Sequence, residues 1–206
     1  MADNLKCCYL TTAYLPPVEY IRLIIKSETA LIEKFEKYQK QSYRSRCHIY
    51  SANGILPLII PVSRNDGHSV SISEIRIDYT KQWQKQHWRA IVSAYKSSPF
   101  FEYYQDDIFP FYMNREDSLF DFNCKLLKMT LDLLGADYNL ETTDSFQKIY
   151  PVGDYRELIH PKRETSLSQK ENGRYHQVFA HKHGFIPNLS ILDLLFNEGP
   201  DAISFL

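Results

Sequence analysis

The sequence predicts an α/β fold: a mixed sheet with an N-terminal strand-helix-strand unit, flanking helices and a short C-terminal docking helix. Three observations support this fold class. Residues 6–35 run from a β-branched and aromatic stretch, through a proline pair, to apolar residues at helical spacing. Two later segments have strong helical periodicity. An Asn-Gly pair between two apolar runs indicates a β-hairpin.

The chain has 206 residues, so we predict that residues 1–206 form a single domain. Hydrophobic residues make up 44% of it, which is enough for a sizeable core. A formal net charge of -1 argues against a nucleic-acid partner, so any anion must be met by a local cluster of cations. We expect no secretory leader and no transmembrane segment, because no apolar stretch approaches roughly 20 residues. A cytoplasmic protein with reduced cysteines is therefore expected.

The first predicted strand covers residues 6–14 and ends at residues 15–17, because proline cannot serve a β-ladder. Apolar residues at helical spacing then indicate a helix to about Lys26, and residues 29–35 indicate a second strand. A parallel crossover of this kind is right-handed. It places residues 14–17 at the carboxyl end of the first strand, beside a helix N-terminus, where anions often bind. No glycine-rich phosphate-binding motif accompanies this loop.

Residues 33–46 combine positive charges with aromatic side chains and contain few acidic residues after Glu36. If this stretch is helical, Lys37, Lys40 and Arg44 share one face; if it is extended, Arg44 and Arg46 do. A solvated basic face and a partly buried site both stay open as interpretations. A buried arginine would require a carboxylate, phosphate or sulfate partner.

An Asn53-Gly54 pair predicts a tight turn that joins strands at residues 47–51 and 55–62. The second of these strands is a continuous apolar run, which we expect to be buried. Residues 64–71 are polar and predict a surface loop. Three isoleucines within residues 72–77 indicate a further strand.

Large apolar residues recur at four-residue steps from Trp83 to Tyr95 and predict an amphipathic helix of about 15 residues. His87 lies on the apolar face of this helix. A lone histidine in such a position is more often a satisfied core residue than a functional one. Residues 100–112 are dense in aromatic side chains and could form core, the wall of a site, or a dimer surface.

Ser118 with Asp121 three residues later predicts the capped start of another helix, which ends at Gly135. Residues 160–174 carry many charges and predict a long exposed loop. Residues 189–197 predict the short C-terminal helix. Asp193 stands in its apolar patch, either as the partner of a cation or as a carboxylate of the first helical turn.

The common catalytic motifs are absent from the sequence, including H-E-x-x-H and G-x-S-x-G. His181 and His183 have metal-like spacing but no nearby cysteine or acidic cluster, so we predict no metal and no cofactor. A cluster of cations and aromatic rings remains. It suits an anionic small molecule, such as a sugar nucleotide or another sugar-linked or acyl-bearing substrate, because lysine and arginine hold an anion and aromatic rings stack on a ring. His87 is a candidate general base.

The chain resembles the WbqC-like family of bacterial proteins over nearly its whole length. Five stretches carry the resemblance: TTAYLPPVEY (11–20), YQKQSYRSRCHI (38–49), LPLIIPV (56–62), WQKQHWRAIVSAYKSSPFFEYY (83–104), and YHQVF with HGFIPNLSILDLLFNEGP (175–200). The family usually has asparagine where this chain has Ser45, which puts any role of that amide in doubt. Some members lie in gene clusters for surface polysaccharide (O-antigen) synthesis. The resemblance therefore implies a transferase, with glycine transfer to a sugar as one proposal.

The resemblance adds weight to Lys40, Arg44, Arg46 and His87 as site residues, because the polar positions of the family motifs fall on them. We predict that the catalytic residues are His87, Lys40 and Asp193. Substrate-binding residues are predicted to be Tyr14, Tyr38, Gln39, Tyr43, Arg44, Arg46, Tyr175 and Gln177. These residues are expected to line one cleft.

Two other functions stay open. An adenylate-forming or nucleotidyl-transfer enzyme would need paired histidines after the first strand, and residues 14–20 contain none. A non-catalytic binding or assembly protein would use the aromatic residues 100–112 as its interface and could form a homo-oligomer.

Overall fold

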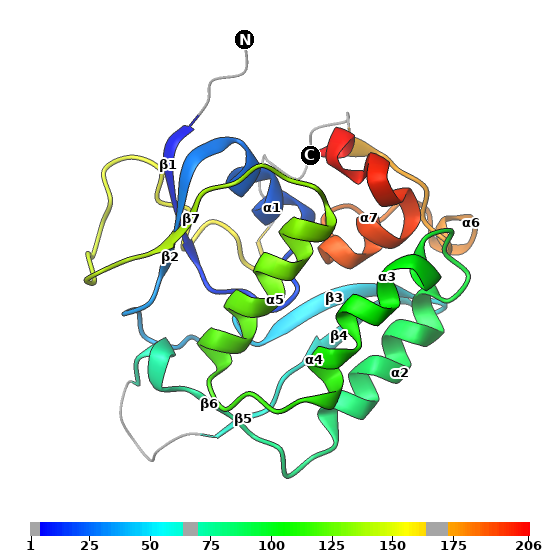
Figure 1. Cartoon of the computed structure of the whole chain (residues 1–206), viewed down its shortest axis with the longest axis horizontal. Coiled ribbons are helices and arrows are strands. Elements are labelled where there is room, and N and C mark those ends of the chain that lie inside the picture. The colour runs from blue at the N-terminus through cyan, green and yellow to red at the C-terminus, as the bar shows by residue number, and fades with distance from the viewer. Residues whose placement is uncertain (1–4, 64–69, 164–172) are drawn as a thin grey trace.

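The structure is a computed structural model that describes residues 5–63, 70–163 and 173–206. A parallel sheet has the strand order β1-β2-β7, formed by Leu5–Thr11, Ser27–Glu33 and Leu140–Thr142. Helix α1 (Val18–Ile25) connects β1 to β2. The predicted α/β class and the predicted strand-helix-strand unit are both confirmed. Figure 1 shows this sheet on the left, with the hairpin β3–β4 and helix α5 between it and helices α2 to α4.

The outer edge of β1 is covered by a segment that is remote in sequence. Tyr9 donates its N–H to the carbonyl of Gly153 at 2.7 Å, and Tyr155 donates to the carbonyl of Tyr9 at 3.0 Å. Gly153 has φ +77, and a Cβ atom there would come within 2.2 Å of the Cys7 carbonyl oxygen. Only glycine permits this close approach. Residues 153–155 therefore close the edge of the sheet.

The predicted hairpin is present as β3 (Arg46–Ser51) and β4 (Gly54–Ile59), paired antiparallel from Ser51 and Gly54 onward. Its side chains alternate between two environments. Leu58 is buried, whereas Ile55 and Ile59 are 54% and 46% exposed. The expectation that the whole run of residues 55–62 is buried is therefore wrong for one face, because successive side chains of a strand point in opposite directions.

The segment after the hairpin differs from the predicted single strand over residues 72–77. Ile72–Glu74 form a 3-10 turn, capped by reciprocal hydrogen bonds between Ser71 and Glu74. The strand of this segment is limited to Arg76–Ile77, which form β6 and pair with β5 (Val62–Ser63). The three isoleucines are buried, but the prediction of one strand over residues 72–77 is wrong for its first part. The predicted loop at 64–71 lies mostly outside the described residues.

Helices α2 (Trp83–Tyr95), α3 (Phe101–Ile108) and α4 (Pro110–Met113) follow, and α2 confirms the predicted amphipathic helix. The aromatic segment 100–112 turns most of its rings inward. Phe101, Tyr104 and Tyr112 are buried and Phe100 and Phe111 are half-buried, whereas Tyr103 is 74% and Phe109 37% exposed. This segment is therefore mainly core.

Helix α5 (Leu119–Leu133) begins at the predicted cap, where Ser118 Oγ accepts a hydrogen bond from the Asp121 N–H at 3.2 Å. Replacing Ser118 by alanine removes this acceptor and should lower the free energy of unfolding by about 1 kcal/mol. Urea denaturation measures this change. Ser118→Thr keeps a hydroxyl and should lose less of the free energy of unfolding. If both variants lose the same amount, the hydroxyl of the cap does not contribute to stability.

The C-terminal part contains α6 (Ala180–His183), α7 (Ile191–Glu198) and the 3-10 helix Gly199–Phe205. Helix α7 confirms the predicted docking helix, with residues 191–197 buried against α1, α3 and β3. Of the predicted exposed loop 160–174, residues 164–172 lie outside the described residues. No helix within the described ranges is both long and apolar enough to cross a bilayer.

Candidate functional site

A cleft of about 610 Å³ lies where the start of α1, the β3–β4 hairpin and the residues before α7 meet. This volume falls within the usual range for small-molecule sites. The lining includes both charged and aromatic side chains. It is formed by Val18, Glu19, Arg22, Tyr43, His48, Ile55, Pro161, Arg163, Gly173, Arg174, Tyr175, Phe185, Ile186, Pro187, Asn188 and Leu189.

Backbone hydrogen bonds between three remote segments build one side of the cleft. The Ile191 N–H donates to the Pro16 carbonyl at 2.8 Å, and the Ser190 N–H donates to the His48 carbonyl at 2.8 Å. Two of the three non-glycine residues with positive φ in the described ranges lie here, Leu15 at +42 and Asn188 at +55. Asparagine tolerates this conformation, but leucine adopts it at a cost, so tertiary contacts hold this junction in place.

The N-terminus of α1 does not offer free amides to an anion. The Val18 N–H donates to the Leu189 carbonyl at 3.0 Å, and the Glu19 N–H donates to Asn188 Oδ1 at 3.0 Å. Glu19 itself also lines the cleft. The expectation of an anion site formed by the helix end at residues 14–17 is therefore corrected, because the protein itself uses these donors.

Positive charge in the cleft comes from arginine side chains instead. Among the described residues, the lining holds three arginines and one glutamate, so three positive charges minus one negative charge give these residues a net charge of +2 without His48. Arg22 is held by the backbone oxygens of Phe205 at 3.0 Å and Leu206 at 3.1 Å. The Arg174 guanidinium lies over the Phe185 ring at 5.8 Å. Guanidinium groups of this kind bind phosphate and carboxylate.

Two predicted residues, Tyr43 and Tyr175, line the cleft. Behind Tyr175 lie two more, because the Tyr175 hydroxyl donates to Asp193 Oδ2 at 2.7 Å and Gln177 Nε2 donates to the same oxygen at 2.8 Å. Gln177 also exchanges two hydrogen bonds of 2.9 Å with the backbone of Ile186, a lining residue. These residues thus fix the wall of the cleft.

Asp193 is fully buried, and burial raises the pKa of its carboxyl to about 6, although hydrogen bonds from Tyr175, Gln177 and Tyr95 oppose the shift. No lysine or arginine among the described residues forms an ion pair with it. The expectation that Asp193 partners a cation is therefore corrected. Its partners are neutral hydrogen-bond donors.

His87 lies in an aromatic part of the core and not in the cleft lining. Its Nδ1 is 3.0 Å from the Tyr14 hydroxyl, which is 2.8 Å from the Tyr112 hydroxyl. The ring stands edge-on to Trp83 at 5.1 Å. Burial lowers the pKa of His87 to about 4. His87 and Tyr14 do contact one another, but no hydrogen bond joins His87 to Lys40, Arg44 or Arg46 in the described parts of the chain.

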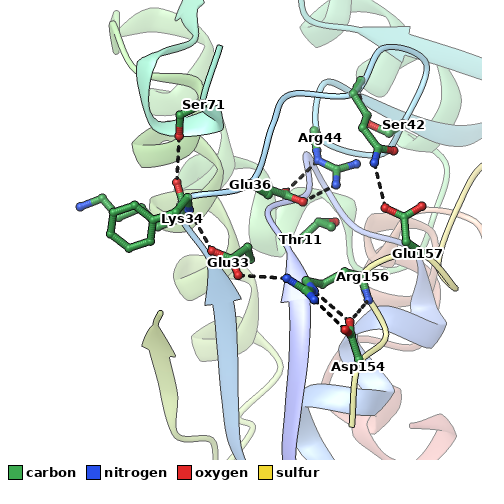
Figure 2. A network of polar contacts seen from close by, with 12 residues as sticks. Thr11, Glu33, Lys34, Glu36, Ser42, Arg44, Ser71, Asp154, Arg156 and Glu157 are labelled. Carbon is green, nitrogen blue, oxygen red and sulfur yellow. Dashed lines mark hydrogen bonds and ion pairs between the residues drawn. The ribbon is translucent and has the colours of Figure 1, made fainter. Parts of the chain in front are cut away.

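Arg44 is buried and forms a bidentate ion pair with Glu36, as Figure 2 shows; its Nε is 2.8 Å from Glu36 Oε1. This carboxylate is the partner that a buried arginine requires, so the charge of Arg44 is used within the protein. Burial raises the pKa of Glu36, against the opposing effect of Arg44.

The rest of the predicted cation-aromatic stretch is dispersed. The Tyr38 hydroxyl is 2.8 Å from Ser45 Oγ, and Gln39 Nε2 donates to Glu157 Oε1 at 2.8 Å. Lys40 is exposed, and Arg46 is half-buried in β3. None of these four lines the cleft. The expectation of a single cleft for all the predicted residues is therefore corrected, while their roles stay predictions.

A second charged network stands at the carboxyl end of β2, also shown in Figure 2. Arg156 Nη1 donates to Glu33 Oε2 at 3.1 Å and its Nη2 donates to Asp154 Oδ2 at 2.6 Å. Glu33 Oε1 accepts from Thr143 Oγ1 at 2.9 Å. Because these groups satisfy one another, the network anchors residues 143–156 to the sheet and leaves little for a ligand to bind.

Other candidate chemistry is structural. Burial raises the pKa of the Cys47 thiol, which makes it a poor nucleophile. His181 Nδ1 and His183 Nε2 each lie 3.1 Å from a backbone carbonyl oxygen. Within the described residues, no three histidine, cysteine or acidic side chains gather in a way that would hold a metal ion.

Comparison with known proteins finds a matching family and a similar mycobacterial protein. Residues 12–159 and 162–205 match the WbqC-like protein family, a range that contains every residue of the cleft lining except Pro161. The chain is similar to the Uncharacterized protein Rv1507c of Mycobacterium tuberculosis, with 24% identity over 227 residues that cover 98% of this chain and 97% of that protein. No solved structure matches the chain.

Proposed function

The chain belongs to the WbqC-like protein family, and from this premise we propose that it is a cytoplasmic transferase that binds an anionic, sugar-linked substrate in the cleft. One observation carries the proposal: three arginines and one glutamate are among the described residues that line the cleft, together with Tyr43, Tyr175 and Phe185. Arginine holds phosphate or carboxylate through paired donors. The apolar faces of aromatic rings can stack against a sugar ring.

The reaction that we propose is acyl or aminoacyl transfer, such as glycine transfer, from an activated acyl donor to a sugar of a surface polysaccharide. A hydroxyl or amine of the sugar loses its proton and bonds to the acyl carbon, and the leaving group of the donor departs with the electron pair of the bond that breaks. Its support is the resemblance to family members found in gene clusters for such polysaccharides. In this proposal the arginines position the anionic part of the substrate. Tyr175, backed by Asp193 and Gln177, fixes one wall of the cleft, which helps to hold the reacting groups together.

Two alternatives have less support. A nucleotidyl-transfer enzyme with an anion at the first helix is disfavoured, because the first amides of α1 already donate to Leu189 and Asn188. An assembly protein that binds through residues 100–112 is disfavoured, because three of the seven aromatic rings of that segment are buried and two more are half-buried against the core. Both arguments favour the arginine-lined cleft as the site of ligand binding.

A ligand panel tests the proposal, with sugar nucleotides and ATP with magnesium titrated in a calorimeter and in thermal shift experiments. At least one sugar nucleotide should bind and raise the melting temperature. Arg174→Gln should weaken that binding about 10- to 100-fold, because a hydrogen bond to a charged group contributes roughly 1.5–3 kcal/mol.

Arg89 provides the matched control, since it is an exposed arginine on α2 outside the cleft lining. Arg89→Gln should bind the sugar nucleotide like the unchanged protein. The proposal fails if no sugar nucleotide binds, or if Arg174→Gln and Arg89→Gln bind equally well. Preferential binding of ATP with magnesium would support the nucleotidyl-transfer alternative.

A further inference from the structure

His48 is the single histidine in the lining of the cleft, as far as the described residues show. It lies in β3 opposite Pro57, and its carbonyl accepts the Ser190 N–H at 2.8 Å, so the backbone position is fixed. Its ring stands edge-on to Tyr43, with the centroids 5.9 Å apart. No hydrogen-bond partner of its ring nitrogens occurs among the described residues. The imidazole is therefore half-buried, oriented and open to a ligand.

Burial and the positive charge of Arg46 both lower the pKa of His48 from its ordinary value of 6.5. The ring is therefore neutral at pH 7, with one N–H donor and one lone pair. The charged groups that share its cleft are Glu19, Arg22, Arg163 and Arg174. The arginines can only donate hydrogen bonds.

Besides Glu19, few side chains among the described lining residues can accept a hydrogen bond, and some of these are already engaged. Asn188 Oδ1 accepts the Glu19 N–H, and the Tyr175 hydroxyl donates to Asp193. A ligand that carries only phosphate needs donors, which the arginines supply. A ligand that also carries ring hydroxyls needs acceptors as well, because a buried hydroxyl without a partner is costly.

We infer that His48 is the residue by which the cleft distinguishes a sugar phosphate from a bare anion. The ring of the sugar lies against the wall formed by Tyr43 and His48, and a sugar hydroxyl donates a hydrogen bond to the free imidazole nitrogen. The phosphate lies at the arginines. This inference rests on the proposed function, and it adds the ligand class and the residue that selects it.

Calorimetry with three probes tests the inference: inorganic phosphate, a hexose 1-phosphate, and the same hexose without phosphate. The unchanged protein should bind the hexose phosphate at least tenfold more tightly than inorganic phosphate, and should bind the free hexose weakly. His48→Phe keeps an aromatic ring beside Tyr43 but has no acceptor. It should weaken hexose phosphate binding roughly tenfold, with inorganic phosphate unaffected.

Two further variants separate recognition from packing. His48→Gln retains an acceptor and should recover part of the preference for the hexose phosphate. Arg174→Gln should weaken both phosphate ligands by a similar factor. The preference of the unchanged protein should also shrink below the pKa of His48, because a protonated imidazole has no lone pair, and His48→Phe should lack this pH dependence.

The outcomes are distinct. If neither phosphate ligand binds the unchanged protein, the anion-binding cleft itself is refuted, and the proposed function with it. If inorganic phosphate binds but the hexose adds nothing, only the role of His48 is refuted. The same conclusion follows if His48→Phe weakens both phosphate ligands alike, since that result indicates a packing role.

Discussion

Replacing Arg44 by methionine is expected to lower the free energy of unfolding by about 3–5 kcal/mol at neutral pH. The reason is the carboxylate that remains. Glu36 is 6% exposed, its two oxygens are held by the Arg44 guanidinium, and no other ion pair to it occurs among the described residues. Methionine fills much of the volume but leaves a buried, uncompensated charge. Chemical denaturation of the two proteins measures the loss.

Two controls isolate the ion pair. In the double variant Arg44→Met with Glu36→Met, no charge remains buried, so the loss should be much smaller than for Arg44→Met alone. Lys125→Met breaks the pair with Glu116 at the surface, where Lys125 is 63% exposed, and should change stability by less than about 1 kcal/mol. Comparable losses in Arg44→Met and the double variant would contradict the argument from burial.

The second large effect is expected from Asp193 as a function of pH. Its pKa of about 6 in the folded protein lies above the value of 3.8 expected when the chain is unfolded. The folded state therefore binds the proton more tightly, and this contribution is fully present below about pH 4. It is lost as the pH rises through 6. The difference of about two pKa units corresponds to roughly 3 kcal/mol.

The variant Asp193→Asn cannot ionise, so it should lack this part of the pH dependence. The free energy of unfolding of Asp193→Asn minus that of the unchanged protein should therefore rise by roughly 3 kcal/mol from pH 4 to pH 7, because the unchanged protein alone loses this contribution. Denaturation curves at several pH values measure the trend. Asp201→Asn is the control, because Asp201 is exposed, and it should follow the unchanged protein. Parallel curves for all three proteins would rule out a raised pKa at Asp193.

Elements with local signals were predictable from the sequence. The strand-helix-strand unit follows from residue spacing and from the proline pair, α5 from the Ser118 cap, and the hairpin from Asn53 and Gly54. β7 was not predicted, since it has only three residues and lacks the apolar alternation of a strand. Residues 72–77 were predicted to be a strand, but Ile72–Glu74 form a 3-10 turn. Isoleucines alone did not decide the backbone conformation, because buried isoleucines occur in turns as well as in strands.

The candidate site was predictable only in part. The cluster of Tyr175, Gln177 and Asp193 lies within one C-terminal stretch, and all three were selected. Arg44 was selected for its charge, but the local partner that neutralises it, Glu36, was overlooked. Arg163 and Arg174 belong to a charged stretch that was interpreted only as a loop. Nothing in the spacing of the sequence indicates that they meet His48 at one cleft.

The bond between Glu33 and Arg156 has a consequence for how the chain folds as it is synthesised. The two residues are 123 positions apart, and the segment that covers the edge of β1 is anchored by the same arginine. When a ribosome has released β1, α1 and β2, the carboxylate at the end of β2 has no cation and one sheet edge is bare. The N-terminal unit therefore reaches its final packing only after most of the polypeptide has emerged.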